Sequence, residues 1–210
     1  MICVNNLKTH NIYRESFGGG ENMTNKRHID TIPVRKGEEL NEENLNAFLS
    51  ENIEGLDAEA PLEITQFPAG ASNLTYHIRK GSWEAVLRRP PLGPVAPKAH
   101  DMGREYTILK AIHPFFKQAP KAYLFTDNTE IIGSPFLLME RKYGYVIDAE
   151  YPEGITPTEE MNRHISEKMV DTLVQLHAID YRKTEMKNMV KPEGFIERQV
   201  KGWIERYERS

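Results

Sequence analysis

The chain has 210 residues, enough for one large domain or for a small domain and part of another, and its 27 Lys and Arg against 31 Asp and Glu give no electrostatic reason to expect a nucleic acid as partner. Cys3 is the only cysteine, which excludes a disulfide framework and a thiolate metal site. No apolar run approaches the roughly 20 residues that cross a membrane and the first residues lack the apolar segment of a signal peptide, so we expect a cytoplasmic protein with no membrane partner.

Residues 1–37 show no sustained periodicity, so we expect a disordered leader or arm. Three glycines and Glu21-Asn22 directly precede Met23, and codons for Gly-Gly-Glu can spell a purine-rich ribosome-binding sequence. Met23 is therefore a candidate natural start, and a flexible glycine linker explains the same residues equally well. A phosphate loop does not, because no strand precedes the glycines and no Lys-Ser or Lys-Thr follows them.

Ordered structure is expected to begin near Leu40 with an amphipathic helix. Apolar residues at helical spacing are Leu45, Phe48 and Leu49. Asn41 precedes them as a candidate N-cap, and Gly55 follows as a candidate helix end. The apolar face predicts that this helix packs on another element.

The segment 62–91 is predicted to form three strands in succession, with a turn at Lys80-Gly81-Ser82 and a stop at Pro90. The loop 67–73 separates the first two strands. Its residues Gly70, Ser72 and Asn73 are small enough for backbone N–H groups to approach phosphate oxygens closely. An ordinary antiparallel hairpin with a glycine in its loop would have a similar sequence.

The third of these strands places an aliphatic residue and a cation on one face. Val86 and Arg88 are two residues apart, whereas Leu87 points the other way. Val86 would lie against an adenine ring and Arg88 would reach the phosphates. The Gly-rich loop and V-A-I-K strand of protein kinases have the same layout with Lys as the cation. Arg suits the role because its planar fork can hold phosphate through two hydrogen bonds.

A helix is predicted from about Asp101 to Pro114. Its expected buried residues are Tyr106, Ile108, Leu109 and Ile112. Glu105 lies on this helix, which directly follows the strand of Arg88. In a kinase-like lobe the helix at this place carries a glutamate that pairs with the strand's cation. A solvated glutamate on a helix surface is the alternative.

Two further strands are expected at 122–126 and 135–140, with a turn at Asp127-Asn128 between them. R-K-Y-G then forms a short crossing segment, and from about Thr156 the pattern is helical only. This order predicts an α+β, protein-kinase-like two-lobe fold, with a five-stranded antiparallel N-lobe, one main helix, and the first helices of an α-helical C-lobe. The predicted divisions are the arm at 1–37, the N-lobe at 38–140, a hinge and linker at 141–155 and the start of the C-lobe at 156–210. Because the last helix still has an uncovered apolar face at Ser210, we expect a truncated C-lobe.

Five stretches carry a resemblance to a known family. They are F-P-A-G-A-S-N-L-T-Y (67–76), V-L-R-R-P-P-L-G (86–93), K-A-H-D-M-G-R-E-Y (98–106), F-L-L-M-E (136–140) and L-V-Q-L-H-A-I-D (173–180). Together they resemble the aminoglycoside-phosphotransferase and choline-kinase-like superfamily, in particular the phosphotransferase domains related to those fused to some acyl-CoA dehydrogenases.

The resemblance implies a site for ATP. Ser72 and Asn73, with Gly70, would belong to the loop that covers the phosphates. Arg88 would be the strand cation and Glu105 its partner on the helix. The hinge contribution would come from Met139, Glu140 and Lys142, the last two through backbone groups that face adenine.

The family also uses a catalytic loop, H-G-D-x-x-x-x-N, and a later D-x-D or D-x-E that holds Mg²⁺. The helical region 156–210 contains neither. His177 and Asp180 with Asn188 are a poor substitute, because the histidine ends an apolar helix and Asn188 comes eight residues after Asp180. A packing or capping role is expected for His177. We therefore expect no catalytic residue and no metal ligand in this chain, with Mg²⁺ held by residues beyond Ser210.

The sequence thus predicts part of an ATP-dependent small-molecule kinase that transfers the γ-phosphoryl group to a hydroxyl, inactive as this chain alone. The expected partners are a small-molecule acceptor, which the closest resemblance suggests to be a hydroxyacyl-CoA, and the missing C-lobe. The alternative is a non-catalytic nucleotide-binding or interaction module.

Overall fold

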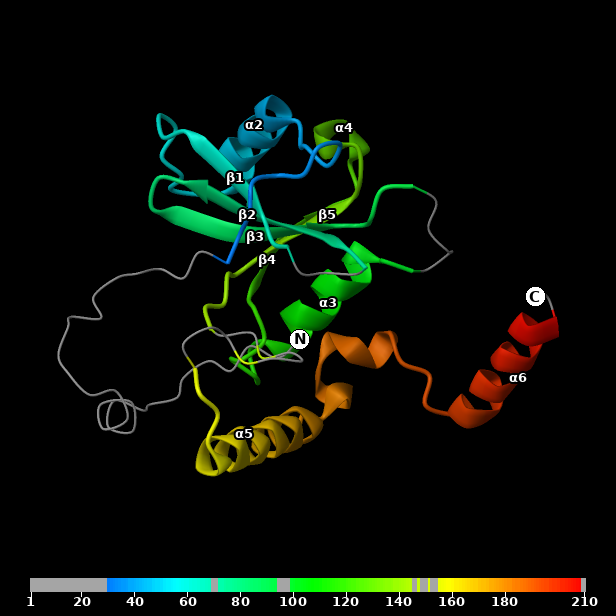
Figure 1. Ribbon diagram of the computed structural model, residues 1–210. Helices are drawn as coiled ribbons and strands as arrows, with labels where there is room; N and C mark the ends of the chain where they lie inside the picture. Colours follow the sequence, from blue (N-terminus) through cyan, green and yellow to red (C-terminus); the bar gives the residue numbers. More distant parts are fainter. Residues whose placement is uncertain are drawn as a thin grey trace.

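The computed structural model describes residues 30–68, 72–93, 99–144, 147, 151 and 155–208 (Figure 1). The elements of the N-terminal part are α2 (Glu42–Asn52), β1 (Leu62–Gln66), β2 (Leu74–Lys80), β3 (Trp83–Arg89), α3 (Met102–Ile112), β4 (Ala122–Thr126), α4 (Thr129–Ile132) and β5 (Phe136–Met139). They are followed by α5 (Glu159–His177), the 3-10 helices η1 (Tyr181–Lys183) and η2 (Glu185–Asn188), and α6 (Phe195–Glu208).

The five strands form one antiparallel sheet in the order β1-β2-β3-β5-β4. Tyr76 of β2 is paired with Leu87 of β3, and Leu87 is paired with Leu138 of β5. These three side chains therefore share one face of the sheet, and their chain neighbours share the other. The predicted α+β class and the five-stranded antiparallel sheet are confirmed.

The hydrophobic core lies between one face of the sheet and the helices α2 and α4. Leu45 and Leu49 of α2 are fully buried against Tyr76, Leu87 and Leu138. Each such leucine contributes about 1.5–3 kcal/mol by leaving water. The helix begins as predicted, because the Asn41 side chain accepts the Asn44 N–H at 3.0 Å.

Helix α3 crosses the sheet on the opposite side, where it packs on β4 and β5 (Figure 1). Asp101 caps it, and Gly103 lies so close to Phe125 that an added Cβ would come within 3.1 Å of the ring. The predicted burial was wrong. The buried residues of α3 are Met102 and Ala111, whereas the four predicted ones (Tyr106, Ile108, Leu109 and Ile112) are only partly covered. Ile108 and Leu109 line a cavity, which leaves this side of α3 partly uncovered.

Two local features differ from the predictions. The turn expected at Asp127-Asn128 opens a short helix, α4, capped by the Asn128 side chain and ended by Gly133 at φ +80°. Residues 30–37, which were expected to belong to the disordered arm, contact the sheet: Ile32 is paired with Gln66, whose side chain accepts the Arg35 N–H at 2.9 Å. Residues 1–29, with Met23, lie outside the described residues, and the division into lobes stays a prediction.

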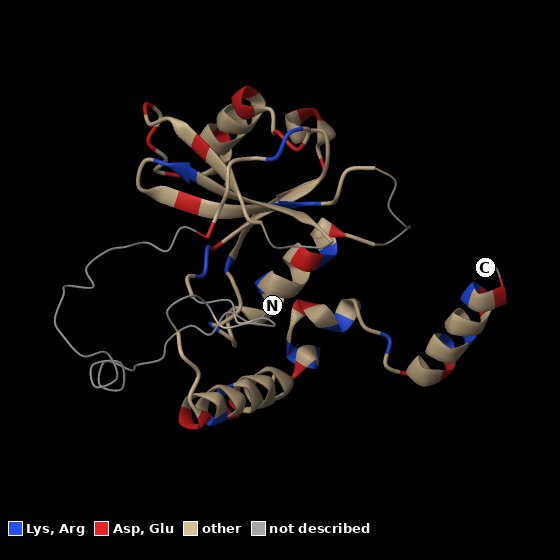
Figure 2. Ribbon diagram, viewed as in Figure 1, with Lys and Arg blue, Asp and Glu red and all other residues tan. Residues whose placement is uncertain are grey.

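The helices after residue 155 carry uncovered apolar surface. The exposed large side chains on α5 and α6 are Met169, Val170, Leu173, Val174, Leu176, Phe195, Ile196, Val200, Trp203, Ile204 and Tyr207. Helix α6 extends away from the rest of the chain (Figure 1). Within the described ranges, none of the helices is both long and apolar enough to span a bilayer. Acidic and basic residues are interspersed along the described elements (Figure 2).

Candidate functional site

Arg88 lies near the end of β3, on the sheet face turned toward α3. Its Nη1 donates to Glu105 Oε1 at 2.6 Å. The Arg88 side chain is 33% exposed and that of Glu105 25%, so the pair is open to a ligand on one side. The ion pair predicted from the order of strand and helix is present, and a freely solvated Glu105 is not what the structure shows.

Asn73 holds a second edge of the same guanidinium. In the amide orientation that satisfies both of its ends, the oxygen accepts from Arg88 Nη2 at 3.0 Å and from Nε at 3.1 Å. The amide nitrogen then donates to Nδ1 of His100 at 2.6 Å and to the backbone oxygen of Ser72 at 3.0 Å. Ser72 and Asn73, both predicted as loop residues of the site, are thus joined to Arg88, while Gly70 lies outside the described residues.

His100 is a site residue that was not predicted. It precedes Asp101, the N-cap of α3, and its φ of +58° is the only positive φ among the described residues other than glycines. Such a backbone is uncommon for histidine. The residue lies in the quoted stretch K-A-H-D-M-G-R-E-Y, but a positive φ at a histidine has no signature in a single sequence.

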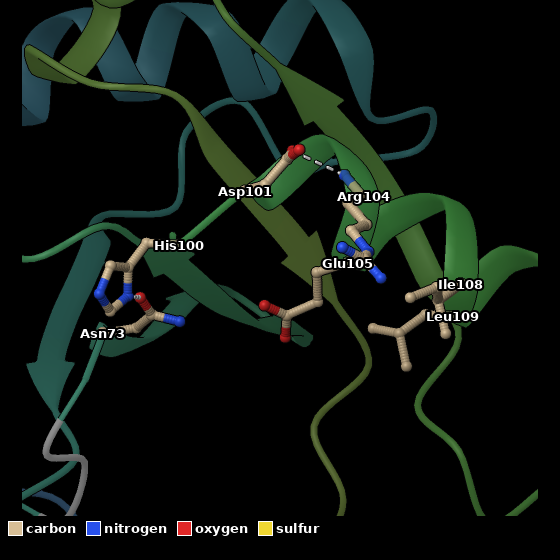
Figure 3. Close-up of a pocket in the computed structure, with 7 residues that line it drawn as sticks. All are labelled: Asn73, His100, Asp101, Arg104, Glu105, Ile108 and Leu109. Carbon is tan, nitrogen blue, oxygen red and sulfur yellow. Dashed lines mark hydrogen bonds between the residues drawn. The ribbon is translucent and has the colours of Figure 1, made fainter. Parts of the chain in front are cut away.

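A cavity of about 350 Å³ opens beside these residues, and Figure 3 shows its lining. It is lined by Asn73, His100, Asp101, Arg104, Glu105, Ile108 and Leu109. The ring of His100 lies against the amide of Asn73, and the Glu105 carboxylate points toward the same space (Figure 3). One part of the cavity is therefore polar, formed by the hydrogen-bonded Asn73 and His100, and another is formed by the apolar Ile108 and Leu109 of α3.

Val86, predicted to lie against adenine, and Met139, predicted to belong to the nucleotide site, are paired on β3 and β5. Val86 is only 7% exposed, so it offers a narrow apolar edge rather than a broad surface. His77 is its neighbour on β2, and its Nε2 lies 2.9 Å from Glu84 Oε2. Burial lowers the pKa of His77, although the hydrogen bond with Glu84 opposes the shift.

The segment after β5 is tied to the sheet through Glu140. Its N–H donates to the Lys121 carbonyl at 2.8 Å, so Glu140 can offer a nucleotide its carbonyl but not its amide hydrogen. Its carboxylate accepts from Lys142 Nζ at 2.8 Å and from the Lys121 N–H at 3.0 Å. Burial raises the pKa of Glu140, but the hydrogen bonds from Lys142 and Lys121 outweigh it and lower the pKa overall. Glu140 and Lys142 thus brace the predicted hinge.

Arg141 is a second residue that sequence reasoning missed. Its guanidinium lies 5.6 Å from the ring centre of Phe67 and 4.5 Å from that of Tyr143, and Nη2 donates to Asp30 at 2.6 Å. The side chain is 7% exposed. Through these contacts Arg141, in the predicted hinge, connects Phe67, where the small-residue loop begins, with Asp30.

His177 and Asp180 lie at the junction of α5 and η1. Asp180 caps η1 by accepting the Arg182 N–H at 3.1 Å, and His177 is exposed in the last turn of α5. Asp180 thus has a capping role. In the part of the chain that the structure describes, no group of three or more His, Cys, Asp or Glu side chains is placed to hold a metal ion.

Known proteins match most of this chain. Residues 63–210 match the family described as "Phosphotransferase enzyme family". Acyl-CoA dehydrogenase family member 11 of Rattus norvegicus is 33% identical over 183 residues, which are 86% of this chain and 23% of the rat protein. Family member 10 of Mus musculus is 32% identical over 178 residues, 85% of this chain and 16% of the mouse protein. The chain therefore spans about a quarter or less of these relatives.

A solved crystal structure from Ralstonia eutropha, described as a candidate aminoglycoside phosphotransferase, has the same fold. It superposes with a TM-score of 0.64 at 25% identity, over 81% of this chain and 48% of that one. The sheet, the Arg88–Glu105 pair and the match over 63–210 lead to one conclusion: this chain belongs to the phosphotransferase enzyme family and has its kinase-like α+β fold.

Proposed function

We propose that the protein containing this chain is an ATP-dependent phosphotransferase that moves the γ-phosphoryl group to a hydroxyl of a small metabolite. The observation that carries the proposal is the Arg88–Glu105 ion pair at 2.6 Å, beside the loop that ends at Asn73. In kinase-like enzymes a strand cation held by a helix glutamate binds the phosphates of ATP. Family membership supports the same chemistry.

Arg88 is the proposed phosphate ligand. A guanidinium keeps its charge at any physiological pH and donates from a planar fork, so it can bind two phosphate oxygens together. Glu105 balances one positive charge and fixes the direction of the fork. In a partly exposed site, such charge-assisted contacts contribute about 1.5–3 kcal/mol.

The base of the nucleotide is proposed to lie along the end of β5. Val86 and Met139 provide apolar contact, and the Glu140 carbonyl and the backbone of Lys142 provide polar groups. The side chains of Glu140 and Lys142 hold this segment against Lys121 and Lys117. A braced hinge favours binding because little chain entropy is lost when the ligand arrives.

The described residues do not fit Mg²⁺, since they bring no carboxylate cluster together. The helical region also lacks the H-G-D-x-x-x-x-N loop that would orient an acceptor hydroxyl. We propose that the catalytic aspartate, its asparagine and the metal ligands come from other parts of the protein, since this chain spans about a quarter of its relatives. This chain's own residues bind and orient the nucleotide.

A hydroxyacyl-CoA is the proposed acceptor. The support is that two relatives are named as acyl-CoA dehydrogenase family members, which connects this domain with acyl-CoA chemistry. A second candidate function is a nucleotide-binding module without transfer activity, favoured by the absence of a catalytic loop from these residues.

The test uses the full-length protein that contains this chain and its Arg88→Ala variant. Titration calorimetry with ATP and with adenosine should show at least about tenfold weaker ATP binding in the variant and unchanged adenosine binding. Arg79→Ala is the matched control, because Arg79 carries the same charge on the neighbouring strand and is paired with exposed Glu63 at 3.4 Å.

Equal ATP affinity in wild type and Arg88→Ala would remove Arg88 from the site. Turnover of labelled ATP with hydroxylated acyl-CoA and aminoglycoside acceptors then separates the two candidate functions. Acceptor-dependent turnover supports the phosphotransferase. ATP binding without turnover on any acceptor would favour the binding module.

A further inference from the structure

We propose that Asn73 and His100 are positioning residues that hold the Arg88 guanidinium in one orientation, with Asn73 acting on Arg88 directly and His100 acting through Asn73. The inference rests on the proposed function, in which Arg88 binds the phosphates of ATP. It assigns Asn73 a different role from direct phosphate contact, and it gives a role to His100.

The hydrogen bonds of Arg88 leave two donors for a ligand. A guanidinium has five N–H donors. Among the described residues, Nε and Nη2 donate to the Asn73 oxygen at 3.1 and 3.0 Å, and Nη1 donates to Glu105 at 2.6 Å. One N–H on each terminal nitrogen then remains for an incoming group such as a phosphate, which accepts charge-assisted hydrogen bonds from arginine.

The side chain of Asn73 is fully engaged by this network. Its oxygen accepts two hydrogen bonds from Arg88, and its nitrogen donates to His100 and to the Ser72 backbone. An amide has two lone pairs and two N–H groups, so no further group is left to contact a phosphate. Asn73 therefore acts on the nucleotide through Arg88.

His100 completes the arrangement of the Asn73 amide. The amide oxygen faces Arg88, because the reversed amide would set N–H groups against the guanidinium, and the amide nitrogen then donates to Nδ1 of His100 at 2.6 Å. A hydrogen-bond acceptor at this place stabilises the orientation that Arg88 requires. The positive φ of +58° at His100 places the ring beside Asn73, directly before the cap of α3 (Figure 3).

The network also accounts for arginine at a strand position where protein kinases have lysine. The Asn73 oxygen is bound by two donors on one edge of a planar group, while Glu105 is bound by a third. A lysine ammonium is a point charge on a flexible stem and cannot present donors in two fixed directions while leaving two more for a ligand. Arg88→Lys should therefore bind ATP more weakly than wild type although it keeps the charge.

The binding experiment uses the full-length protein with three variants, Asn73→Ala, His100→Gly and Arg88→Lys, titrated with ATP and with adenosine. Glycine is chosen at position 100 because it adopts a positive φ without strain and has no side-chain acceptor. We expect ATP binding to weaken about five- to twentyfold in Asn73→Ala and Arg88→Lys and about two- to fivefold in His100→Gly, with adenosine unchanged. His113→Gly, at the other end of α3 with Nδ1 2.8 Å from the Ala119 oxygen, is the matched control and should bind both ligands as wild type does.

The orientation of Arg88 is measured separately, without nucleotide. In protein labelled with ¹⁵N-arginine, the Nε–H signal lost in Arg88→Lys is that of Arg88. Its exchange with water should be slow in wild type and in His113→Gly, and at least about fivefold faster in Asn73→Ala and His100→Gly, since the accepting oxygen is then absent or free to turn away.

The two measurements separate failure of the inference from failure of the proposed function. Fast exchange in wild type, or the same rate in all variants, overturns the positioning role whatever the ATP affinities are. Equal losses of ATP and adenosine binding would indicate a merely structural role and overturn it as well. If wild type binds no ATP but the exchange rates change as expected, the proposed function fails and the positioning of Arg88 stands.

Discussion

Glu105→Gln tests how much the carboxylate beside Arg88 contributes to phosphate binding. The substitution keeps the size of the side chain and one accepting oxygen but removes the charge. At the 2.6 Å separation of Nη1 and Oε1, the direct attraction is about 2 kcal/mol in water and about 6 kcal/mol at an effective dielectric constant of 20. Because the two side chains are 33% and 25% exposed, water competes, and the net contribution is about 1–2 kcal/mol.

A second effect has the opposite sign. Removing the Glu105 carboxylate also removes its repulsion of the bound phosphates, which favours ATP. The orienting effect acts at 2.6 Å, whereas bound phosphates would lie beyond the guanidinium, where the repulsion is weaker and more screened. We therefore expect ATP binding about two- to tenfold weaker, a milder loss than in Arg88→Ala.

The assay is calorimetric titration of the full-length protein with ATP and with adenosine. Glu63→Gln is the control, because Glu63 is paired with Arg79 at 3.4 Å on the same sheet. ATP affinity within twofold of wild type would show that Glu105 behaves as a solvated glutamate. Tighter ATP binding would show that repulsion outweighs orientation, and either result refutes the reasoning.

Four further predictions concern stability and activity. Tyr76→Phe should lower the Tm by about 2–8 °C, because the fully buried hydroxyl, whose pKa burial raises to about 12, donates to the Glu38 carbonyl at 2.7 Å; a change under 1 °C would contradict this. Burial lowers the pKa of His77, so the unfolded chain binds more protons below pH 6.5, and the Tm should fall from pH 7 to 5.5 more steeply in wild type than in His77→Gln; parallel curves would exclude it. Deleting residues 1–22 should leave the Tm unchanged, whereas deleting 1–33 removes the contacts of Asp30 with Arg141 and of Ile32 with Gln66 and should lower it by several degrees; identical melting of the two deletions argues against a docked segment. The purified 210-residue chain with labelled ATP, Mg²⁺ and acyl-CoA or aminoglycoside acceptors should show no acceptor-dependent turnover, because it lacks the catalytic loop; turnover abolished by Arg88→Ala would locate that machinery here.

Local rules predicted much of the fold. The strands were recognised from their alternation and their turns, α2 begins at the predicted cap Asn41, and α3 begins where predicted, near Asp101. The order of strand and helix predicted the Arg88–Glu105 pair, because in this fold the helix after the cationic strand packs beside it. These features depend on periodicity, capping and element order, all of which are present in a single sequence.

Other features were beyond local rules. Helix α4 has four residues, too few for a helical period to show. The burial of α3 was misjudged because half-covered apolar residues look the same in sequence as buried ones. The docking of residues 30–37 depends on pairing between Ile32 and Gln66, and this isolated pair leaves no periodic pattern in the sequence.

The candidate site divides in the same way. The sequence by itself determined the residue types of the proposed phosphate site: small residues in the loop, Arg88 on the strand and Glu105 on the helix. Only the tertiary structure decided that Asn73 and His100, 27 residues apart, meet beside Arg88, and that Arg141 reaches Asp30 across 111 residues. The physical reason is that hydrogen bonds between distant residues depend on backbone directions, such as the positive φ of His100, that are set by the packing of the whole sheet against its helices.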